Sequence, residues 1–353
     1  MVRKLKKILS ISIALLLLLS LVLLGCISTV PPAPKKVRVG YLLADLHQLA
    51  YMIAKNKTVG GGISFFEKYG IEVEDAIGAP YPHGGAEMDH FAAGDVDIGL
   101  LGSPPAIIKH VNANVDTVII AQANEEGSAL VVSRDIERFS DLTGKTIAVP
   151  SRSAIQFFLL LTLAEKEGVE IGKISIVDLA PKDMRAKLEA KEIDGFIAWE
   201  PFVSDAVISG TGKVLATSRD IWPNHPCCVV AVDKKFAVQN PDAVIGFLKA
   251  HVEATNYINK ALKNPYSEEY KILIAIAMQF TGREEQVIKE AFKLINFKSD
   301  IDEKFKSSIV EYTEKLIQFK IISEEKLRER GYVNSTDLAE KYIDTSYLAR
   351  AKQ

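Results

Sequence analysis

Residues 141–150 read DLTGKTIAVP, a polar turn with a glycine that leads into a short apolar strand. Strands and helices alternate on both sides of this stretch, and the alternation starts afresh after it. Such alternation with short connections is typical of parallel sheets covered by helices. The sequence therefore predicts two α/β units, one before the turn and one after it.

The two units have similar predicted strand patterns. In the first unit, apolar strands are predicted over residues 37–43, 71–76, 96–101 and 115–121. In the second unit, strands are predicted over residues 129–133, 146–150, 174–179 and 195–198. Helices are predicted between the strands, with the clearest over residues 46–55, 86–93, 154–167 and 181–190.

The chain then returns to the first unit. An apolar strand is predicted over residues 227–232, and the pattern is helical from Pro241 to the end, with Thr281-Gly-Arg-Glu284 fitting a capping box. We therefore predict two lobes joined by two crossing strands, with a helical tail packed on the first lobe. Lobe I is predicted to comprise residues 37–128 and 229–353, and lobe II residues 129–228. Lobes connected in this way can close over a ligand like a clamp.

Composition excludes some classes of function. The 353 residues suffice for two separate cores, and a hydrophobic content of 48% with 25% charged residues is ordinary for a globular protein. The formal net charge is −2, so no large basic field is available to hold a nucleic acid.

The N-terminus has the anatomy of an export signal. Basic residues at positions 3, 4, 6 and 7 precede an apolar run over 8–24, and Gly25 stands directly before Cys26. A cysteine just after the cut is where a bacterial-type lipoprotein is acylated, so we predict a signal peptide over residues 1–26 and a lipid on Cys26. This places the protein at the outer face of the cell membrane. An uncleaved anchor remains the alternative, although the apolar run is slightly shorter than the about 20 residues that a spanning helix needs. The Pro-rich residues 27–36 are predicted to be a tether.

Two further cysteines, Cys227 and Cys228, are adjacent in the sequence. A disulfide between neighbours would close a strained small ring, so we interpret both as buried thiols. Their place in an apolar strand argues against a reactive thiolate.

Candidate ligand-binding residues of lobe I follow its strands, because open α/β sheets bind ligands beyond the carboxyl ends of their strands. Adjacent glycines let backbone N–H groups approach a ligand closely, and a neutral imidazole can hydrogen-bond a ring nitrogen or an anion, although a loop histidine can equally be a surface residue. The candidates are Asp45, His47, Gln48, His83, Gly84, Gly85, Ser103, Pro104 and, near the first crossing, Glu125.

Lobe II offers an anion site. Ser151, Arg152 and Ser153 stand just before a helix predicted to begin near Ala154, where free N–H groups and the helix dipole favour negative charge. The alternative is that Ser153 only caps the helix and Arg152 is a solvated charge.

The remaining candidates are Trp199, Glu200, Asn224 and His225. Trp199 could stack on a flat ligand or simply pack between helices. Glu200 could pair with Arg152 or with a cationic group on the ligand, which would favour a zwitterion or an amino-bearing heterocycle over nitrate. Asn224 and His225 lie near the returning strand, in the cleft or in a rigid loop bounded by prolines.

Four segments carry a family resemblance: FFEKYGIEV at 65–73, AAGDVDIG at 92–99, LTGKTIAVP at 142–150 and DGFIAWEP at 194–201. In their order and spacing the chain resembles the solute-binding lipoproteins of ABC importers of the nitrate, sulfonate and taurine type, which are related to the thiamine-pyrimidine-precursor binding proteins.

The resemblance implies an α/β periplasmic-binding-protein type II fold. It also implies a monomer without a cofactor that captures a small anionic, zwitterionic or heterocyclic solute, such as a sulfonate, nitrate, taurine or a pyrimidine. The solute passes unaltered to ABC permease and ATPase subunits. The identity of the solute does not follow, because members bind different molecules.

Two other functions stay open. A metal-binding lipoprotein would bring His47, His83, His225 and Glu200 together on zinc. An enzyme on the same fold is the second alternative, and the export signal argues against it, because such relatives work in the cytosol.

Overall fold

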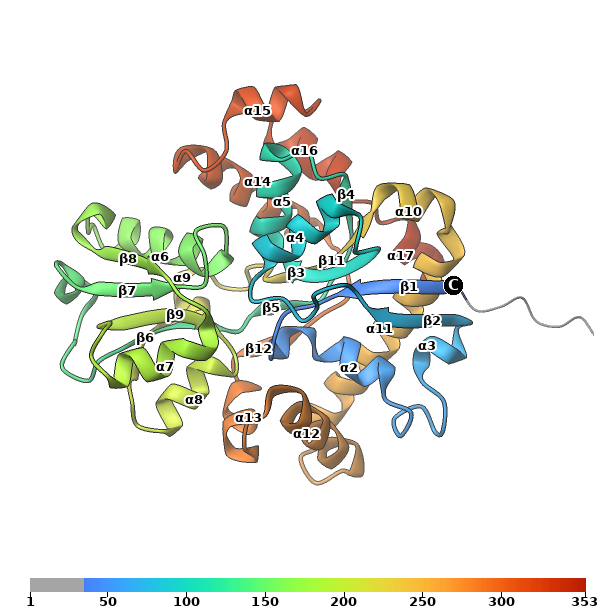
Figure 1. Cartoon of the computed structure of the whole chain (residues 1–353), viewed down its shortest axis with the longest axis horizontal. Coiled ribbons are helices and arrows are strands. Elements are labelled where there is room, and N and C mark those ends of the chain that lie inside the picture. Colours follow the sequence, from blue (N-terminus) through green and yellow to red (C-terminus); the bar gives the residue numbers. More distant parts are fainter. Residues whose placement is uncertain (1–34) are drawn as a thin grey trace, which may run out of the picture. The chain divides into compact units, whose positions relative to one another are not determined.

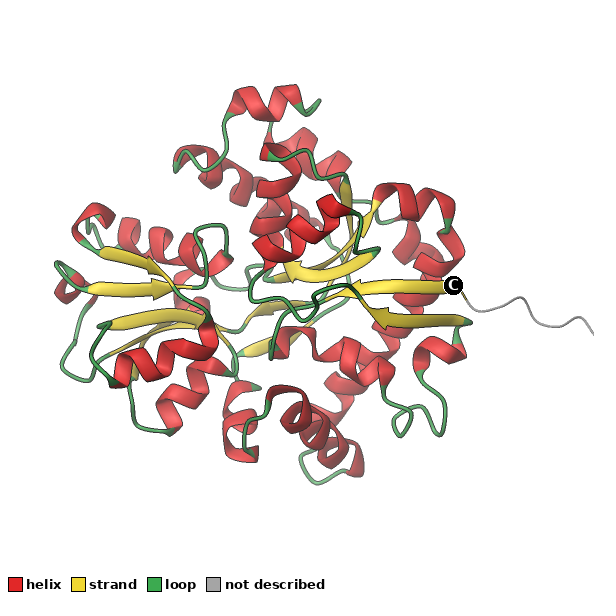
Figure 2. Cartoon of the chain, in the orientation of Figure 1, coloured by secondary structure: helices red, strands yellow, loops and turns green. Residues whose placement is uncertain are grey.

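The computed structural model describes residues 35–353, and these form one compact unit. The predicted signal peptide, the lipidation residue Cys26 and all but the last two tether residues lie outside this range. Within it, two five-stranded sheets are each flanked by helices (Figures 1 and 2). The two-lobed α/β architecture predicted from the sequence is confirmed.

The first sheet has the strand order β2-β1-β3-β11-β4. Its strands are β1 (Lys35–Gly40), β2 (Ile71–Asp75), β3 (Ile98–Gly102), β4 (Thr117–Gln122) and β11 (Cys228–Asp233). Strand β1 runs parallel to β2 and β3, whereas β11 runs antiparallel to β3 and β4.

The second sheet has the order β10-β6-β9-β7-β8. Its strands are β6 (Ser128–Val132), β7 (Thr146–Val149), β8 (Ser175–Asp178), β9 (Gly195–Trp199) and β10 (Lys213–Thr217). Strand β7 runs parallel to β8 and β9, and β6 runs antiparallel to β9 and β10.

Both sheets are mixed, so the prediction of parallel sheets was wrong for one strand in each sheet. The exceptions, β6 and β11, are the strands that enter a sheet from the other lobe. A parallel neighbour requires a crossover, usually a helix, on the same sheet. Strands that arrive directly from the opposite lobe need no crossover, and here both run antiparallel.

Helices cover the faces of both sheets (Figure 1). With the first sheet lie a short 3₁₀ turn (Leu46–Gln48), α2 (Leu49–Lys55), α3 (Phe65–Lys68), α4 (Gly84–Ala93) and α5 (Ser103–Asn112). With the second lie α6 (Ile155–Lys166), α7 (Pro181–Glu189), α8 (Phe202–Ile208) and α9 (Ser218–Ile221).

The C-terminal tail is mainly helical, as predicted. It comprises α10 (Lys234–Gln239), α11 (Pro241–Leu262), α12 (Glu268–Thr281), α13 (Glu285–Ala291), α14 (Glu303–Gln318), α15 (Glu324–Glu329), α16 (Ser335–Tyr342) and α17 (Ser346–Ala351). Helix α11 buries apolar residues at helical spacing against α2, α3 and β1, and Phe247 stacks on Phe66 with ring centroids 5.3 Å apart. Helix α13 also reaches the second lobe, where it packs on α8.

The capping box predicted at residues 281–284 does not form. Thr281 is the last residue of α12, and its Oγ1 donates a hydrogen bond to the Ala277 carbonyl at 2.8 Å. Gly282 follows in the left-handed region, with φ of 67°, and closes α12. A C-terminal glycine stop therefore occupies the residues that the capping box would need.

Two short segments connect the lobes. The first is strand β5 (Asn124–Glu126), which pairs with β12 (Ile295–Phe297), a strand of the tail that the sequence pattern did not predict. The second is the segment that leads back to β11, and its Pro226 forms a β-bridge with Glu125 of β5. Both acidic side chains of β5 are buried and paired: Glu125 accepts from Lys298 at 2.6 Å, and Glu126 accepts from Arg219 at 2.7 Å. The connection is thus fixed by hydrogen-bonded charges rather than by apolar packing alone.

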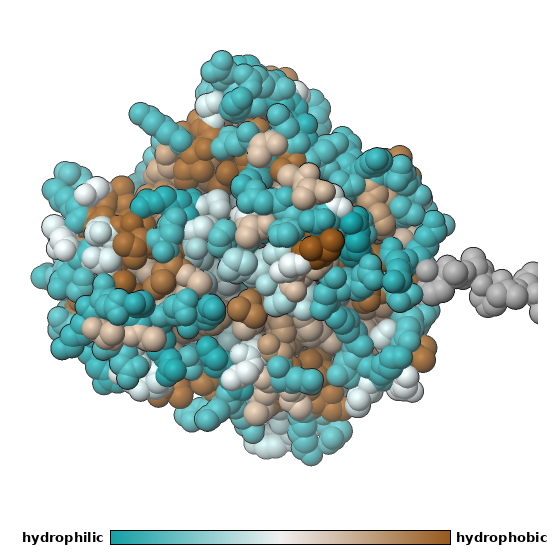
Figure 3. Space-filling view, in the orientation of Figure 1, coloured by the Kyte–Doolittle hydropathy of each residue, from teal (hydrophilic) through white to brown (hydrophobic). Residues whose placement is uncertain are grey.

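The surface of the described unit is mainly polar. Figure 3 shows a hydrophilic face on which apolar residues form separate patches. None of the helices within residues 35–353 combines the length and the hydropathy that crossing a membrane requires.

Candidate functional site

A small cavity lies where the carboxyl ends of β1 and β3 face β9 and the start of α6. Residues from both sheets line it: Leu42, Asp45, His47, Gly84, Gly102, Pro105, Ala154, Ile155, Gln156, Trp199, Cys227 and Cys228. The space for the centres of water-sized spheres is about 20 Å³, which is room for about one water molecule. The rule that placed the ligand site beyond the carboxyl ends of the strands therefore leads to this cavity.

His47 is held in the 3₁₀ turn that follows β1. The carboxylate of Asp45 accepts the His47 backbone N–H at 3.0 Å, which caps the turn, and its Oδ1 lies 3.4 Å from His47 Nδ1. Gln48 supports the same turn, because its Oε1 accepts the Leu42 N–H at 2.6 Å and its Nε2 lies 3.3 Å from Asp45 Oδ2. Asp45, His47 and Gln48 are all buried.

The orientation of the His47 ring is set by Gly127. The Gly127 carbonyl accepts a hydrogen bond from His47 Nε2 at 2.9 Å, so Nε2 carries a proton. Gly127 has φ of 84°, and a Cβ there would lie 2.2 Å from Nε2, so both conformation and space require glycine. The other ring nitrogen, Nδ1, consequently faces the cavity.

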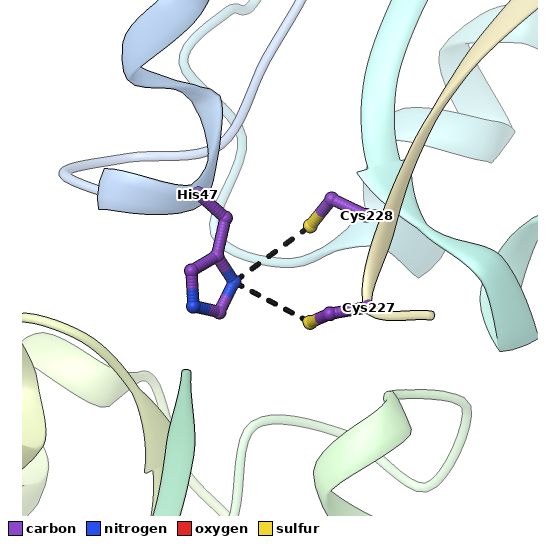
Figure 4. A group of neighbouring side chains, drawn as sticks. All are labelled: His47, Cys227 and Cys228. Atoms are coloured by element: carbon purple, nitrogen blue, oxygen red, sulfur yellow. Dashed lines mark hydrogen bonds between the residues drawn. The ribbon is translucent and has the colours of Figure 1, made fainter. Parts of the chain in front are cut away.

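Cys227 and Cys228 stand at the start of β11 and face that nitrogen (Figure 4). Their Sγ atoms lie 3.4 Å and 3.9 Å from His47 Nδ1, and both are free, buried thiols. Asn124 of β5 fixes this corner, since its carbonyl accepts the Cys227 N–H and its Oδ1 accepts the Cys228 N–H, each at 3.0 Å.

The cluster is strongly coupled electrostatically. Burial raises the pKa of Asp45 to about 6, although His47 opposes the rise. Burial would lower the pKa of His47, but Cys227 and Asp45 outweigh it and raise that pKa to about 9. Burial would likewise raise the pKa of Cys227, but hydrogen bonding from Cys228 and the His47 charge hold it well below the usual value for a thiol. Both cysteines are buried free thiols, as predicted, but the lowered pKa of Cys227 beside His47 differs from the unreactive thiol expected in an apolar strand.

The same three residues could hold a metal ion. One ligand atom each from His47, Cys227 and Cys228 lies within 4.8 Å of the others. The zinc set considered from the sequence is different, and the described residues do not bring it together: His83, His225 and Glu200 each have separate partners.

Four of the predicted binding residues line the cavity, namely Asp45, His47, Gly84 and Trp199. The Trp199 ring packs edge-on against Phe202, with centroids 6.0 Å apart. Its buried indole N–H has no acceptor among residues 35–353. A buried donor without a partner is costly, so this side chain combines a packing role with an unmet hydrogen-bonding need.

Other predicted residues lie behind the cavity wall. Gln48 supports Asp45, and Ser103 Oγ donates to the Pro226 carbonyl at 3.4 Å. Pro104 and Gly85 are buried in the first turns of α5 and α4 without lining the cavity. Glu200 is fully buried, and its carboxylate accepts the Ser204 N–H and hydroxyl at 3.0 and 2.9 Å. Burial raises the pKa of Glu200 to about 7.

The expected anion site at Ser151, Arg152 and Ser153 has a different geometry. Arg152 is exposed and donates to the Ile176 carbonyl at 2.8 Å, with Asp178 at 3.8 Å, and it does not line the cavity. The serine hydroxyls lie 3.0 Å from each other, and the N-cap of α6 is Ala154 rather than Ser153. Glu200 pairs with Ser204 instead of with Arg152.

The remaining candidates are occupied elsewhere. His83 caps α4, where its Nδ1 accepts the Ala86 N–H at 3.1 Å. His225 is buried with its Nδ1 3.0 Å from the Tyr312 hydroxyl, and exposed Asn224 donates its backbone N–H to Glu126. Glu125 points to β12.

Sequence reasoning missed Cys227, Cys228 and Gln156 as cavity residues. The available signal was the position of the cysteine pair at the very start of the returning strand, directly after His225-Pro226. Because β11 runs antiparallel to β3, the start of β11 lies beside the carboxyl end of β3. Cys228, the first residue of β11, is opposite Gly102, the last residue of β3.

Comparisons with known proteins agree with this fold. A family model described as the NMT1-like family matches residues 31–270. The taurine-binding periplasmic protein of Escherichia coli K12 is 33% identical over 177 residues, which cover 49% of this chain and 54% of that protein. The chain thus matches only about half the length of this curated relative.

Solved structures share the fold at low identity. The ligand-binding component of an ABC-type import system from Staphylococcus aureus, with zinc bound, has a TM-score of 0.71 at 17% identity and covers 90% of this chain and 99% of its own. The periplasmic nitrate-binding protein NrtA from Synechocystis PCC 6803 has a TM-score of 0.70 at 18% identity, covering 91% of this chain and 89% of its own.

Proposed function

Because this chain belongs to the NMT1-like family, we propose that it is the extracytoplasmic solute-binding component of an ABC importer. It captures one small molecule between lobe I (residues 37–128 and 229–353) and lobe II (residues 129–228). The solute passes unaltered to a permease driven by an ATPase subunit. Support comes from relatives named as taurine-binding and nitrate-binding proteins.

The observation that carries this proposal is the origin of the cavity lining. Asp45 and His47 follow β1, Gly102 ends β3, and Ile155 and Trp199 come from the second sheet. A ligand held here touches both lobes at once, so its binding energy favours the closed arrangement over an open one. A site with walls on two lobes suits capture and release, because separating the lobes removes half of the contacts.

The residues that line the cavity also indicate which chemical class of solute could bind. The unpartnered Trp199 N–H calls for a hydrogen-bond acceptor, which an anionic or zwitterionic solute supplies. Of the residues predicted from the sequence, we assign contact with the solute to Asp45, His47, Gly84 and Trp199.

Solute binding is tested by thermal unfolding of the purified chain with taurine, alkanesulfonates, nitrate and aminopyrimidines. A ligand present at 100 times its Kd stabilises the folded state by about 2.7 kcal/mol, which raises Tm. Small-angle scattering measures the closure that should accompany binding. A panel in which no compound changes either Tm or the scattering curve contradicts the proposal.

A matched pair of variants tests the assigned contact. Trp199→Phe keeps an aromatic ring but removes the N–H, so it should weaken the binding of any solute found. Trp222→Phe is the control, because Trp222 packs on Tyr312 outside the cavity lining. Equal affinity in both variants would remove Trp199 from the site.

We also propose that Cys26 carries a lipid and that the chain acts as a monomer. Cys26→Ser should move the expressed protein from the membrane fraction to the soluble fraction, whereas Cys227→Ser should leave its distribution unchanged. Membrane association that persists in Cys26→Ser would instead support the uncleaved anchor.

A further inference from the structure

We propose that the cavity is a binding site for a thiophilic divalent metal ion of the zinc class, held by Cys227 Sγ, Cys228 Sγ and His47 Nδ1, with the Asp45 carboxylate as the fourth ligand. The binding rests on the geometry of these four side chains. The metal site therefore does not depend on the solute-binding function proposed above.

The distances fit tetrahedral coordination. Bonds of about 2.3 Å to sulfur and about 2.0–2.2 Å to nitrogen and oxygen place neighbouring ligand atoms of a tetrahedral zinc site roughly 3.3–3.8 Å apart. Here His47 Nδ1 lies 3.4 Å from Cys227 Sγ and 3.9 Å from Cys228 Sγ. Asp45 Oδ1 lies 3.4 Å from Nδ1, and Asp45 Oδ2 lies 3.9 Å from Cys228 Sγ. Four of the six ligand pairs therefore lie within a few tenths of an ångström of the required edges, with Asp45 facing His47 through Oδ1 and Cys228 through Oδ2.

Hydrogen bonds from neighbouring groups also orient the ligand residues. Metal-binding histidines usually donate their other ring N–H to a carbonyl or carboxylate, which fixes the tautomer, and His47 donates Nε2–H to the Gly127 carbonyl at 2.9 Å. Gln48 lies 3.3 Å from the Asp45 carboxylate, and Asn124 accepts the Cys228 N–H at 3.0 Å. The Asn124 carbonyl likewise accepts the Cys227 N–H at 3.0 Å, so each of the four ligands has a side-chain or backbone partner that orients it.

The size and charge of this spot suit a single bound metal ion. The space available is about 20 Å³, room for about one water and hence for a single ion. Within the described chain, the lining residues include the buried acid Asp45 and no Lys or Arg, so His47 is the only residue of the lining that could pair with it as a cation. Buried charges are normally paired or bound to metals, and a pair of thiolates selects zinc-like ions over magnesium or calcium.

The test uses the full chain in a Cys26→Ser background, reduced with a phosphine and stripped of metal, so that only two thiols remain. Cobalt(II) serves as the probe, because thiolate ligation produces charge-transfer absorption and tetrahedral geometry intensifies the visible bands. We expect one equivalent of cobalt to bind, zinc to displace it, and zinc to raise Tm.

Variants assign the ligands. Cys227→Ser and Cys228→Ser should each reduce the charge-transfer band, and His47→Gln should weaken zinc binding by more than about tenfold. His90→Gln is the control, since His90 lies on α4, pairs with Asp95 after the end of that helix and does not line the cavity. Circular dichroism establishes that each variant is folded. The zinc-induced rise in the Tm of the protein with all four ligands intact is a second measurement, and it does not depend on any variant folding.

The outcomes separate the two proposals. Absence of the cobalt band in the reduced chain, or its persistence when both cysteines are serine, overturns the metal site. If taurine or nitrate raises Tm while zinc does not, the solute-binding function stands and the metal site falls. If zinc binds to the four side chains but no ligand changes the scattering curve, the metal site stands and the transport role falls.

Discussion

Replacing Glu200 with glutamine should change how the stability of this protein depends on pH. The Glu200 carboxylate is fully buried behind the cavity, accepts two hydrogen bonds from Ser204, and has a pKa raised from 4.5 to about 7 by burial. Between these two pH values the folded protein holds one more proton at this site than the unfolded chain. The free energy of unfolding therefore falls as pH rises through this window, and the penalty is complete above about pH 7.

The magnitude follows from the shift. A difference of about 2.5 pKa units at about 1.4 kcal/mol per unit gives a penalty of about 3 kcal/mol at neutral and higher pH. The glutamine side chain would be uncharged at every pH, and its amide oxygen can still accept the Ser204 N–H while its amide nitrogen donates to the hydroxyl. The variant should thus gain about 2–3 kcal/mol of stability relative to the parent between about pH 5 and about pH 8.

Urea unfolding at the two pH values measures this difference, with circular dichroism and tryptophan fluorescence compared to check that the transition is two-state. Glu311→Gln is the matched control for the loss of a carboxylate, because Glu311 lies on the exposed side of α14. If Glu200→Gln shifts the unfolding free energy by the same amount at both pH values, burial does not hold this carboxyl neutral and the reasoning is refuted.

Three further substitutions test other parts of the fold, each by urea unfolding. Phe247→Ala removes the ring stacked on Phe66 in the first core and should cost about 3–5 kcal/mol, whereas Val238→Ala, at an exposed site, should cost under about 1 kcal/mol. Lys298→Met leaves the buried Glu125 without its cation. Because Lys298 is itself about one-third exposed (35%), the loss of unfolding free energy should fall below the roughly 3–5 kcal/mol of a fully buried pair. An unchanged unfolding midpoint would show that the hydrogen bond from Asn296 is enough to hold Glu125. Glu87→Gln should stabilise the protein more at high pH than at low pH, because burial raises the pKa of this carboxyl; a loss at high pH would mean that Glu87 is charged and paired.

Local sequence patterns were sufficient for most strands of the two large sheets and for their order along the chain, but not for β5, β10 or β12. Strands such as β3 and β9 are short apolar runs between turn signals, and α11 follows a helical apolar period, so each depends on neighbours a few residues away. The general location of the cavity could also be predicted, because Asp45 and His47 follow β1 and Trp199 is the last residue of β9.

Long-range packing decided the rest. His47 and Cys227 are 180 residues apart in sequence and meet only because β11 returns antiparallel beside β3. Arg152 and Glu200, promising by sequence, took partners on their own lobe, Ile176 and Ser204. A sequence pattern fixes which residues stand at an edge of a sheet, but the partner that each side chain meets depends on how the two sheets and the tail pack, and that is a property of the whole folded chain.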